Sequence, residues 1–260
     1  PAVHGEAAPA ALLGSLSREI HVWLLSPEDV PDERLPALEA LLDGRERARH
    51  VRYLFPEDRR LFAVSHGFAR RVLSRYAPVA PQEWRFEANE HGRPAIAAPA
   101  GLPELRFSLS HVRSLVAVLV ATGVEAGVDV EQVRALAGLE SVARCAFSAQ
   151  ERQALQELPE AARPERFFAC WTLKEAYAKA RGLGLALPFD EVSFCFGAGR
   201  PPALAPGPAL GDRAEDWRFE VHRPDPRHVL SVAVRGGARD GRAVVLRRAR
   251  DESGDEESSP

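Results

Sequence analysis

Residues 106–132 read RFSLSHVRSLVAVLVATGVEAGVDVEQ, and this stretch decides the fold class. Its apolar and β-branched residues fall into three runs separated by short turns, which predicts strands at 106–111, 115–121 and 126–132. The run at 115–121 is the best candidate for a membrane span, yet it is far shorter than the roughly 18 residues of a membrane helix. We therefore expect successive strands here and no contact with a membrane.

Helical patterns lie on both sides of these strands. A helical periodicity covers 36–76 and breaks near Phe55-Pro56, because the residue before a proline disfavours helix. A second helical block covers 148–158 and 164–182, with Gly182 placed to end it. Further strands are expected at 20–25, 192–196, 216–223, 228–234 and 243–248, and 84–96 is expected to form a strand and a Gly-Pro turn.

This order of elements predicts an α+β protein with two halves of similar make-up, 19–125 and 126–250. A crevice between such halves is the default place for a functional site. Residues 1–18 are expected to be a loose leader, and 251–260, with five acids and no base, a disordered acidic tail. The Pro- and Gly-rich 197–211 is expected to be an irregular loop.

The composition excludes several classes of protein. With 45% apolar and 27% charged residues the chain is ordinary for a globular protein, neither collagen-like nor wholly disordered. Its cysteines, Cys145, Cys170 and Cys195, are odd in number and widely spaced, which fits neither a disulfide framework nor a zinc site. We expect each to be a small buried hydrophobe. The N-terminal sequence lacks the basic start of a secretory signal, so the expected location is the cytoplasm.

The sharpest local feature is Gly127-Val128-Asp129-Val130-Glu131. Side chains alternate along a strand, so Asp129 and Glu131 share one face and repel each other unless a cation neutralises them. One interpretation is a site for a hard divalent cation, Mg²⁺, which takes oxygen ligands. The other is a solvated strand face, helped by Arg134.

On the helix at 164–182, four residues spaced four apart share a face: Phe167, Trp171, Glu175 and Lys179. Glu175 and Lys179 could form an ordinary exposed pair, or supply a third oxygen ligand and a clamp on an anion. Of 34 basic residues, only Lys174 and Lys179 are lysines, which favours a need for a compact ammonium here.

Two further groups could bind an anion. Ser108 and Ser110 share a face of the first strand, which ends at His111, although a histidine there is often only a satisfied polar residue. Arginines gather in the first half, as a solubilising helix face or as ligands of phosphates: Arg45, Arg47, Arg49, Arg52, Arg59, Arg60 and Arg93. Together with the carboxylates and the lysine, these residues describe a Mg²⁺-dependent site for a polyphosphate.

Four segments, taken in order and spacing, resemble the 4′-phosphopantetheinyl transferases of the surfactin-synthetase-activating type. They are HGRP at 91–94, FSLSH at 107–111, GVDVE at 127–131 and WTLKEAYAKARGLGL at 171–185. The resemblance covers about residues 19–236. It implies two α+β halves related by a pseudo-twofold axis, with coenzyme A and Mg²⁺ in the cleft between them. It also implies transfer of 4′-phosphopantetheine from coenzyme A to a serine of an acyl or peptidyl carrier protein, with release of 3′,5′-ADP.

The resemblance also implies roles for particular residues. Asp129, Glu131 and Glu175 would hold Mg²⁺. Glu175 would also act as the base for the carrier serine, and Lys179 would neutralise the pyrophosphate. Other residues would bind coenzyme A: Arg49, Arg60, Arg93, Ser110 and His111. Two positions depart from the family pattern, because Ser108 stands where asparagine is common and Arg93 where lysine is common.

Alternatives remain at this point. The chain could be a module that binds coenzyme A or another partner without turnover. It could also be a metal-dependent nuclease, although the usual Glu-x-Lys of such sites is missing. Without residues 251–260, the chain carries 34 basic against 32 acidic residues, which argues against a nucleic-acid surface. We therefore expect a monomeric transferase with a carrier protein as its partner and no nucleic acid.

Overall fold

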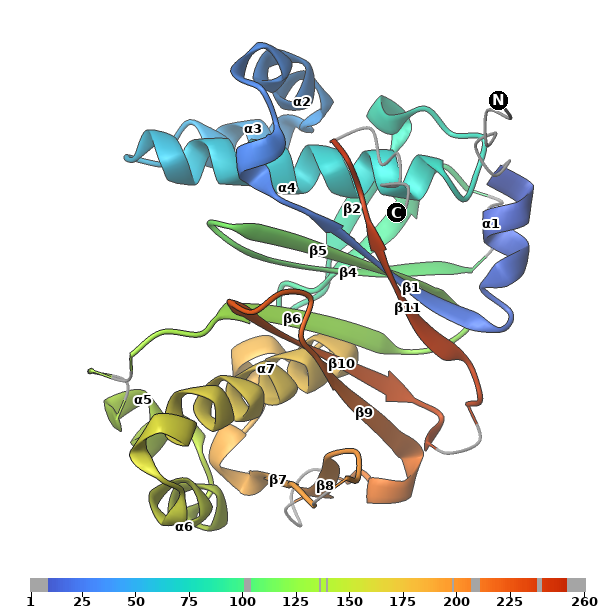
Figure 1. Cartoon of the computed structure of the whole chain (residues 1–260). Helices are drawn as coiled ribbons and strands as arrows, with labels where there is room; N and C mark the ends of the chain where they lie inside the picture. Colours follow the sequence, from blue (N-terminus) through green and yellow to red (C-terminus); the bar gives the residue numbers. More distant parts are fainter. Residues whose placement is uncertain are drawn as a thin grey trace, which may run out of the picture. The chain divides into compact units, whose positions relative to one another are not determined.

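The computed structural model describes residues 9–100, 104–135, 137–138, 140–197, 199–206, 211–237 and 240–251. They form two compact units (Figure 1). Of these residues, the first unit takes those up to Glu87, those between Pro94 and Gly123 and those from Arg242 onward, and the second takes those in Ala88–Arg93 and Val124–Gly241.

The first unit is built on a four-stranded sheet in the order β11-β1-β5-β4. Its strands are β1 (Glu19–Leu25), β4 (Leu105–Val112), β5 (Leu115–Thr122) and β11 (Ala243–Arg248). β1 pairs antiparallel with β5, β5 antiparallel with β4, and β1 parallel with β11. A short hairpin, β2 (Arg85–Ala88) and β3 (Pro94–Ala98), precedes β4.

The described helices of the first unit are α1 (Pro9–Ser15), α2 (Leu35–Leu41), α3 (Gly44–His50) and α4 (Pro56–Ser74). Of these, α4 packs on the sheet, and α2 and α3 pack on α4 (Figure 1). The 19-residue α4 lies across the sheet (Figure 1) and packs Phe68 and Val72 into one core with Trp23 and Val118. It begins at Pro56, where the missing N–H is not needed by the helix. This proline explains the predicted break in the helical pattern.

The second unit is built on a three-stranded antiparallel sheet in the order β6-β10-β9. Its strands are β6 (Ala126–Gln132), β9 (Trp217–His222) and β10 (His228–Arg235), with a separate pair β7 (Val192–Cys195) and β8 (Ala203–Pro206). Its helices are α5 (Glu140–Ala146), α6 (Ala149–Glu157) and α7 (Arg163–Arg181). The 19-residue α7 packs along the sheet (Figure 1) and ends at Gly182, whose φ of 70° is left-handed as predicted for a C-cap.

The two units share one plan. In each, a first strand leads to a 19-residue helix, a two-stranded hairpin follows, and two antiparallel strands complete the sheet. The sheet orders correspond as well, because β1-β5-β4 matches β6-β10-β9 strand for strand. The α+β class with two similar halves is therefore confirmed.

Several expectations about the ends of the chain need correction. The predicted leader is not loose from Pro9 onward: α1 forms there, and Leu12 and Leu16 are buried in the core. The second half was expected to run to residue 250, but β11 pairs with β1 and so belongs to the first unit. Both errors have the same cause. A local pattern of apolar residues predicts a helix or a strand, but it does not show which distant segment that element packs against. Of the predicted tail, 252–260 lie outside the described residues.

Two smaller expectations were also wrong. Within the supposedly irregular 197–211, Ala203–Pro206 forms β8, because its backbone pairs with β7 and Leu204 is buried. Only Cys170 is a buried cysteine, whereas Cys145 and Cys195 are exposed. Among the described helices, none is long and apolar enough to cross a membrane.

Candidate functional site

Strand β6 and helix α7 approach each other at backbone distance because residue 127 is glycine. A Cβ at Gly127 would lie 2.2 Å from the carbonyl oxygen of Ala176 and 2.6 Å from the backbone nitrogen of Ala180. No side chain fits in this space. The glycine therefore lets α7 lie directly on β6, with Lys179 Cβ only 3.1 Å from the same point.

This packing brings Asp129 of β6 against Lys179 of α7. Lys179 Nζ donates a hydrogen bond to Asp129 Oδ1 at 2.6 Å. The side chain of Asp129 is 8% exposed, and that of Lys179 is 27% exposed. Two residues predicted to share one site are thus in direct contact, and a partly exposed ammonium pairs with a nearly buried carboxylate.

Glu175 and Glu131 complete a cluster of three carboxylates that affect one another. Burial, then repulsion from Asp129 and Glu131, raises the pKa of Glu175 to about 7, although Lys179 acts in the opposite direction. Burial and Asp129 also raise the pKa of Glu131, against the lowering effect of Arg134, Lys179 and a hydrogen bond from Trp171. The Arg134 guanidinium lies 3.6 Å from the Glu131 carboxylate. The strand face that carries Asp129 and Glu131 is therefore half-buried, and the like charges on it repel each other.

The three carboxylates offer the oxygen ligands that Mg²⁺ prefers, but the described side chains do not form a metal-binding group. Three carboxylates whose negative charges oppose one another would be stabilised by a divalent cation, which prefers oxygen ligands. In the described residues, no three His, Cys, Asp or Glu side chains are gathered closely enough to hold a metal ion. Asp129 is instead paired with Lys179.

The second lysine, Lys174, is a structural residue. Its side chain is fully buried and lies 2.7 Å from the Glu151 carboxylate. Its ammonium also donates to the carbonyls of Phe189, at 2.6 Å, and Val192. The other oxygen of Glu151 accepts from the backbone N–H of Phe194 at 2.9 Å. Glu151 was not among the residues predicted from the sequence, although it is the N3 residue of a capping box whose N-cap is Ser148.

Four of the predicted coenzyme A ligands lie in the first unit. Ser110 is buried on β4, opposite Ala117, and the next residue, His111, is exposed. The Arg49 guanidinium lies 5.3 Å from the ring centre of Phe62. Arg60 is engaged by its own unit, since it pairs with Asp32 and donates to the carbonyls of Pro27 and Val30.

The fifth predicted ligand, Arg93, lies in the second unit and touches α7. Its Nη1 donates to the carbonyl oxygen of Ala180 at 2.7 Å, one residue after Lys179. Nearby Asn89, whose amide donates to the carbonyl oxygen of Gly182 at 2.7 Å, was not among the residues predicted from the sequence. The available signal was an asparagine at the start of a turn that contains Gly92.

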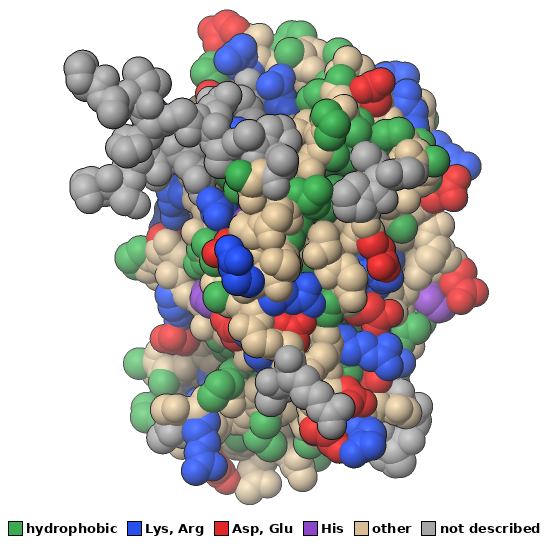
Figure 2. All heavy atoms as spheres, turned by 90° about the vertical axis from the view of Figure 1, so that its right-hand side faces the viewer, with side chains coloured by type: hydrophobic (Ala, Val, Ile, Leu, Met, Phe, Trp, Pro, Cys, Tyr) green, Lys and Arg blue, Asp and Glu red, His purple; other side chains and the backbone are tan. Residues whose placement is uncertain are grey.

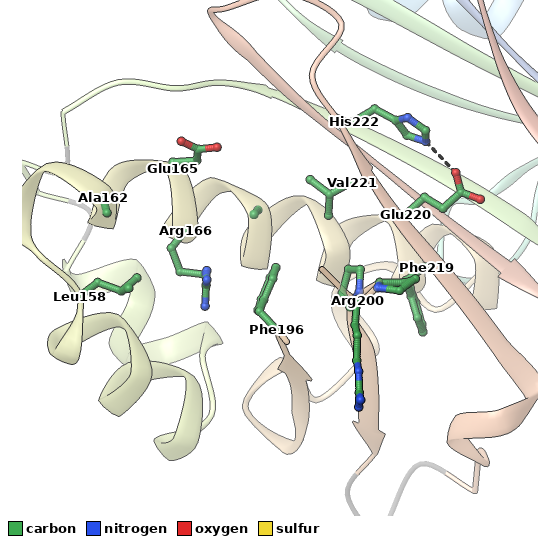
Figure 3. A pocket seen from close by; sticks show the side chains of 13 residues that line it. Leu158, Ala162, Glu165, Arg166, Phe196, Arg200, Phe219, Glu220, Val221 and His222 are labelled. Atoms are coloured by element: carbon green, nitrogen blue, oxygen red, sulfur yellow. Dashed lines mark ion pairs between the residues drawn. The ribbon is translucent and has the colours of Figure 1, made fainter. Parts of the chain in front are cut away.

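A cavity of about 520 Å³ lies elsewhere in the second unit and contains none of the predicted residues (Figure 3). Side chains of α7 and β9 line it, among them Arg166, which lies 4.1 Å above the Phe196 ring, and the ion pair of Glu220 with His222. On the face in Figure 2, basic and acidic side chains are interspersed and do not gather into one basic surface. Neither this cavity nor this face adds a residue to the group formed by Asp129, Glu131 and Glu175.

Comparisons with known proteins identify the family. Residues 125–233 match the model of the 4′-phosphopantetheinyl transferase superfamily, and residues 30–123 match that of the 4′-phosphopantetheinyl transferase N-terminal domain. The 4′-phosphopantetheinyl transferase HetI of Nostoc sp. is 35% identical over 221 residues, which are 85% of this chain and 90% of that protein. The 4′-phosphopantetheinyl transferase Sfp of Bacillus subtilis is 30% identical over 151 residues, or 58% of this chain and 64% of that protein.

One solved structure similar to this chain is that of a holo-(acyl-carrier-protein) synthase from Bacillus anthracis. The two are 17% identical with a TM-score of 0.38, and the match covers 44% of this chain and 98% of that one. The assignment does not depend on it. The two family models meet at the boundary between the two units, and they leave the nuclease alternative without support. This chain belongs to the 4′-phosphopantetheinyl transferase superfamily.

Proposed function

We propose that this enzyme transfers the 4′-phosphopantetheine arm of coenzyme A to a serine hydroxyl of an acyl or peptidyl carrier protein. The serine oxygen forms a new bond to the β-phosphorus of the pyrophosphate. The bond from that phosphorus to the bridging oxygen breaks, and 3′,5′-ADP leaves. The observation that supports the proposal, in a chain of this family, is the contact of β6 with α7 at Gly127, where Lys179 pairs with Asp129.

Glu175 suits the role of the base. Without a bound cation, burial and the neighbouring acids raise the pKa of Glu175 to about 7, and a carboxylate beside the carrier serine can accept its proton. Lys179 supplies a compact positive charge that can turn from Asp129 toward the phosphates, since its side chain is partly exposed. The two residues lie one helical turn apart on α7, so a single helix presents both.

Asp129, Glu131 and Glu175 are the residues that would hold Mg²⁺. A bound Mg²⁺ would neutralise the pyrophosphate and relieve the repulsion among the three carboxylates. Because Asp129 pairs with Lys179, binding of Mg²⁺ to Asp129 would replace this partner and would leave the Lys179 ammonium available for an anion.

The phosphates of coenzyme A would meet Arg49, Arg93, Ser110 and His111, with Arg60 as a further candidate. The exposed Arg49 and His111 support this assignment. Arg60 would first have to leave Asp32. The same proposal makes the enzyme a monomer, because one chain supplies both units of the shared plan, and its expected location is the cytoplasm.

The test is intact-protein mass spectrometry of an apo carrier protein incubated with the enzyme, coenzyme A and Mg²⁺. The expected result is a gain of one phosphopantetheine arm on the carrier that disappears when EDTA replaces Mg²⁺. A gain that persists in EDTA would remove the metal from the proposal. No gain with fatty-acid, polyketide and peptide carriers, together with calorimetric binding of coenzyme A, would identify a binder without turnover.

A further inference from the structure

The turn at residues 89–93 is organised around the side chain of Asn89. Its Oδ1 accepts the backbone N–H groups of His91, at 3.0 Å, and Arg93, at 2.8 Å. The backbone closes the same turn, since Asn89 N–H donates to the carbonyl of Arg93 at 3.0 Å. Gly92 takes a left-handed φ of 85°, which favours glycine. The acceptor half of the Asn89 amide thus shapes the turn.

The donor half of the same amide holds the end of α7. Asn89 Nδ2 donates to the carbonyl oxygen of Gly182 at 2.7 Å, and Arg93 Nη1 donates to that of Ala180 at 2.7 Å. The last carbonyls of a helix lack partners within it, and a guanidinium placed there also interacts favourably with the helix dipole. The turn therefore acts as a cap on α7 that is supplied from a distant part of the sequence.

The fit between turn and helix end is tight. A Cβ on Gly182 would lie 3.0 Å from Cδ of Arg93 and 3.1 Å from Nδ2 of Asn89. Gly182 also has a left-handed φ. Its lack of a side chain is therefore required both by this backbone conformation and by the close contact with the turn. The turn thus contacts the helix end closely as well as through its two hydrogen bonds.

Lys179 lies in the helical turn that is held in this way. On one side, Gly127 of β6 approaches Lys179 Cβ and the backbone of Ala180. The 89–93 turn holds the carbonyl of the same Ala180 and that of Gly182. The same contacts therefore hold the backbone that carries Lys179 and the turn that carries Arg93. The ammonium of Lys179 and the guanidinium of Arg93 are both assigned to the phosphates of coenzyme A.

We propose that Asn89 is a positioning residue for the transfer: it ties the 89–93 turn to the end of α7 and thereby sets Arg93 and Lys179 for the phosphates of coenzyme A. The inference rests on the proposed function for its effect on coenzyme A. An amide suits the position because it donates to α7 and accepts from the turn at once.

Replacement of Asn89 by aspartate separates these two tasks. In Asn89→Asp the acceptor that shapes the turn is retained, while a carboxylate oxygen replaces the donor and faces the Gly182 carbonyl. The expected result is a KM for coenzyme A raised about tenfold, the effect of losing one hydrogen bond and gaining a repulsion. The KM for the carrier protein stays at the wild-type value.

The matched control is Asp225→Ala. Asp225 also organises a turn of the second unit, where it accepts the backbone N–H of Arg227 at 2.8 Å and holds His228 at 2.7 Å, and it does not contact α7 through these bonds. This control is expected to lower the melting temperature without changing the KM for coenzyme A. A merely structural role of Asn89 would give the same result as the control.

Hydrogen–deuterium exchange without ligand makes the test independent of turnover. In Asn89→Asp, faster exchange is expected in peptides covering 176–184 and 86–94, whereas Asp225→Ala leaves both unchanged. Unchanged exchange at 176–184 would show that Asn89 does not hold the end of α7, and faster exchange with both kcat and the KM for coenzyme A unchanged would overturn the positioning role. A wild-type enzyme that transfers nothing would instead overturn the proposed function, and exchange would still decide whether Asn89 holds α7.

Discussion

Lys179 Nζ of α7 lies 2.6 Å from Asp129 Oδ1 of β6, so the charge assigned to the phosphates and a carboxylate assigned to the metal form one ion pair. The same ammonium lowers the pKa of both Glu131 and Glu175. Lys179 thus counteracts the repulsion among the three acids as long as no cation lies between them.

The first prediction concerns Lys179→Ala. Its kcat should fall about 10²- to 10³-fold, the scale of losing one preorganised electrostatic group. The fold should remain, because the side chain is partly exposed and contributes little to the core. Steady-state kinetics with coenzyme A and a carrier protein measure the change. A kcat within the error of the wild type would show that Lys179 does not act on the phosphates.

The second prediction concerns the carboxylates. Asp129→Ala and Glu175→Gln should each abolish measurable turnover while their circular dichroism stays that of the wild type. Removing Asp129 also removes a repulsion, so the pKa of Glu175 should move down toward its ordinary value. Near-normal turnover of Asp129→Ala in the presence of Mg²⁺ would refute the metal assignment.

The third prediction is a pH dependence of stability in EDTA. Burial and the neighbouring acids raise the pKa of Glu175 from 4.5 to about 7, so the folded protein binds this proton more tightly than the unfolded chain does. The resulting stabilisation is complete below about pH 4.5 and is lost as the pH rises through about 7, a change on the order of 2–3 kcal/mol. Urea titrations across this range should show a steeper decline for wild type than for Glu175→Gln. Equal slopes would contradict the raised pKa.

The fourth prediction separates the two lysines. Lys174→Met should lower the free energy of unfolding by about 3–5 kcal/mol, because it leaves the buried Glu151 carboxylate without its cation. Lys179→Met, on the same helix, should cost far less. Adding Glu151→Gln to Lys174→Met should recover part of the loss, since the uncompensated charge is then removed. Equal stabilities of the two single variants would show that Lys174 is not structural.

The fifth prediction tests the approach of β6 to α7. Gly127→Ala places a methyl group against the backbone of Ala176 and Ala180, which cannot yield as a side chain can, so a loss of about 2–4 kcal/mol is expected. Gly44→Ala is the control, because a Cβ there meets nothing within 4 Å. Thermal denaturation compares the two, and a Gly127→Ala protein as stable as the control would mean that the helix can move away.

Local sequence patterns were sufficient for the strands at the centre of the chain and for both long helices. Alternation, proline and glycine act over a few residues, so the positions of β6, α4, α7 and the cap at Gly182 follow from the sequence alone. The same alternation placed Asp129 beside Glu131, and helical spacing placed Glu175 beside Lys179.

Only the tertiary structure decided which of these residues meet. No local pattern shows that Lys174 is buried against Glu151, that Lys179 pairs with Asp129, or that Asn89 holds the end of a helix about ninety residues later. These contacts join segments far apart in the chain, and they depend on how closely two backbones approach. The glycine at 127 was visible in the sequence from the start, but its reason, the absence of any room beside α7, exists only in the folded protein.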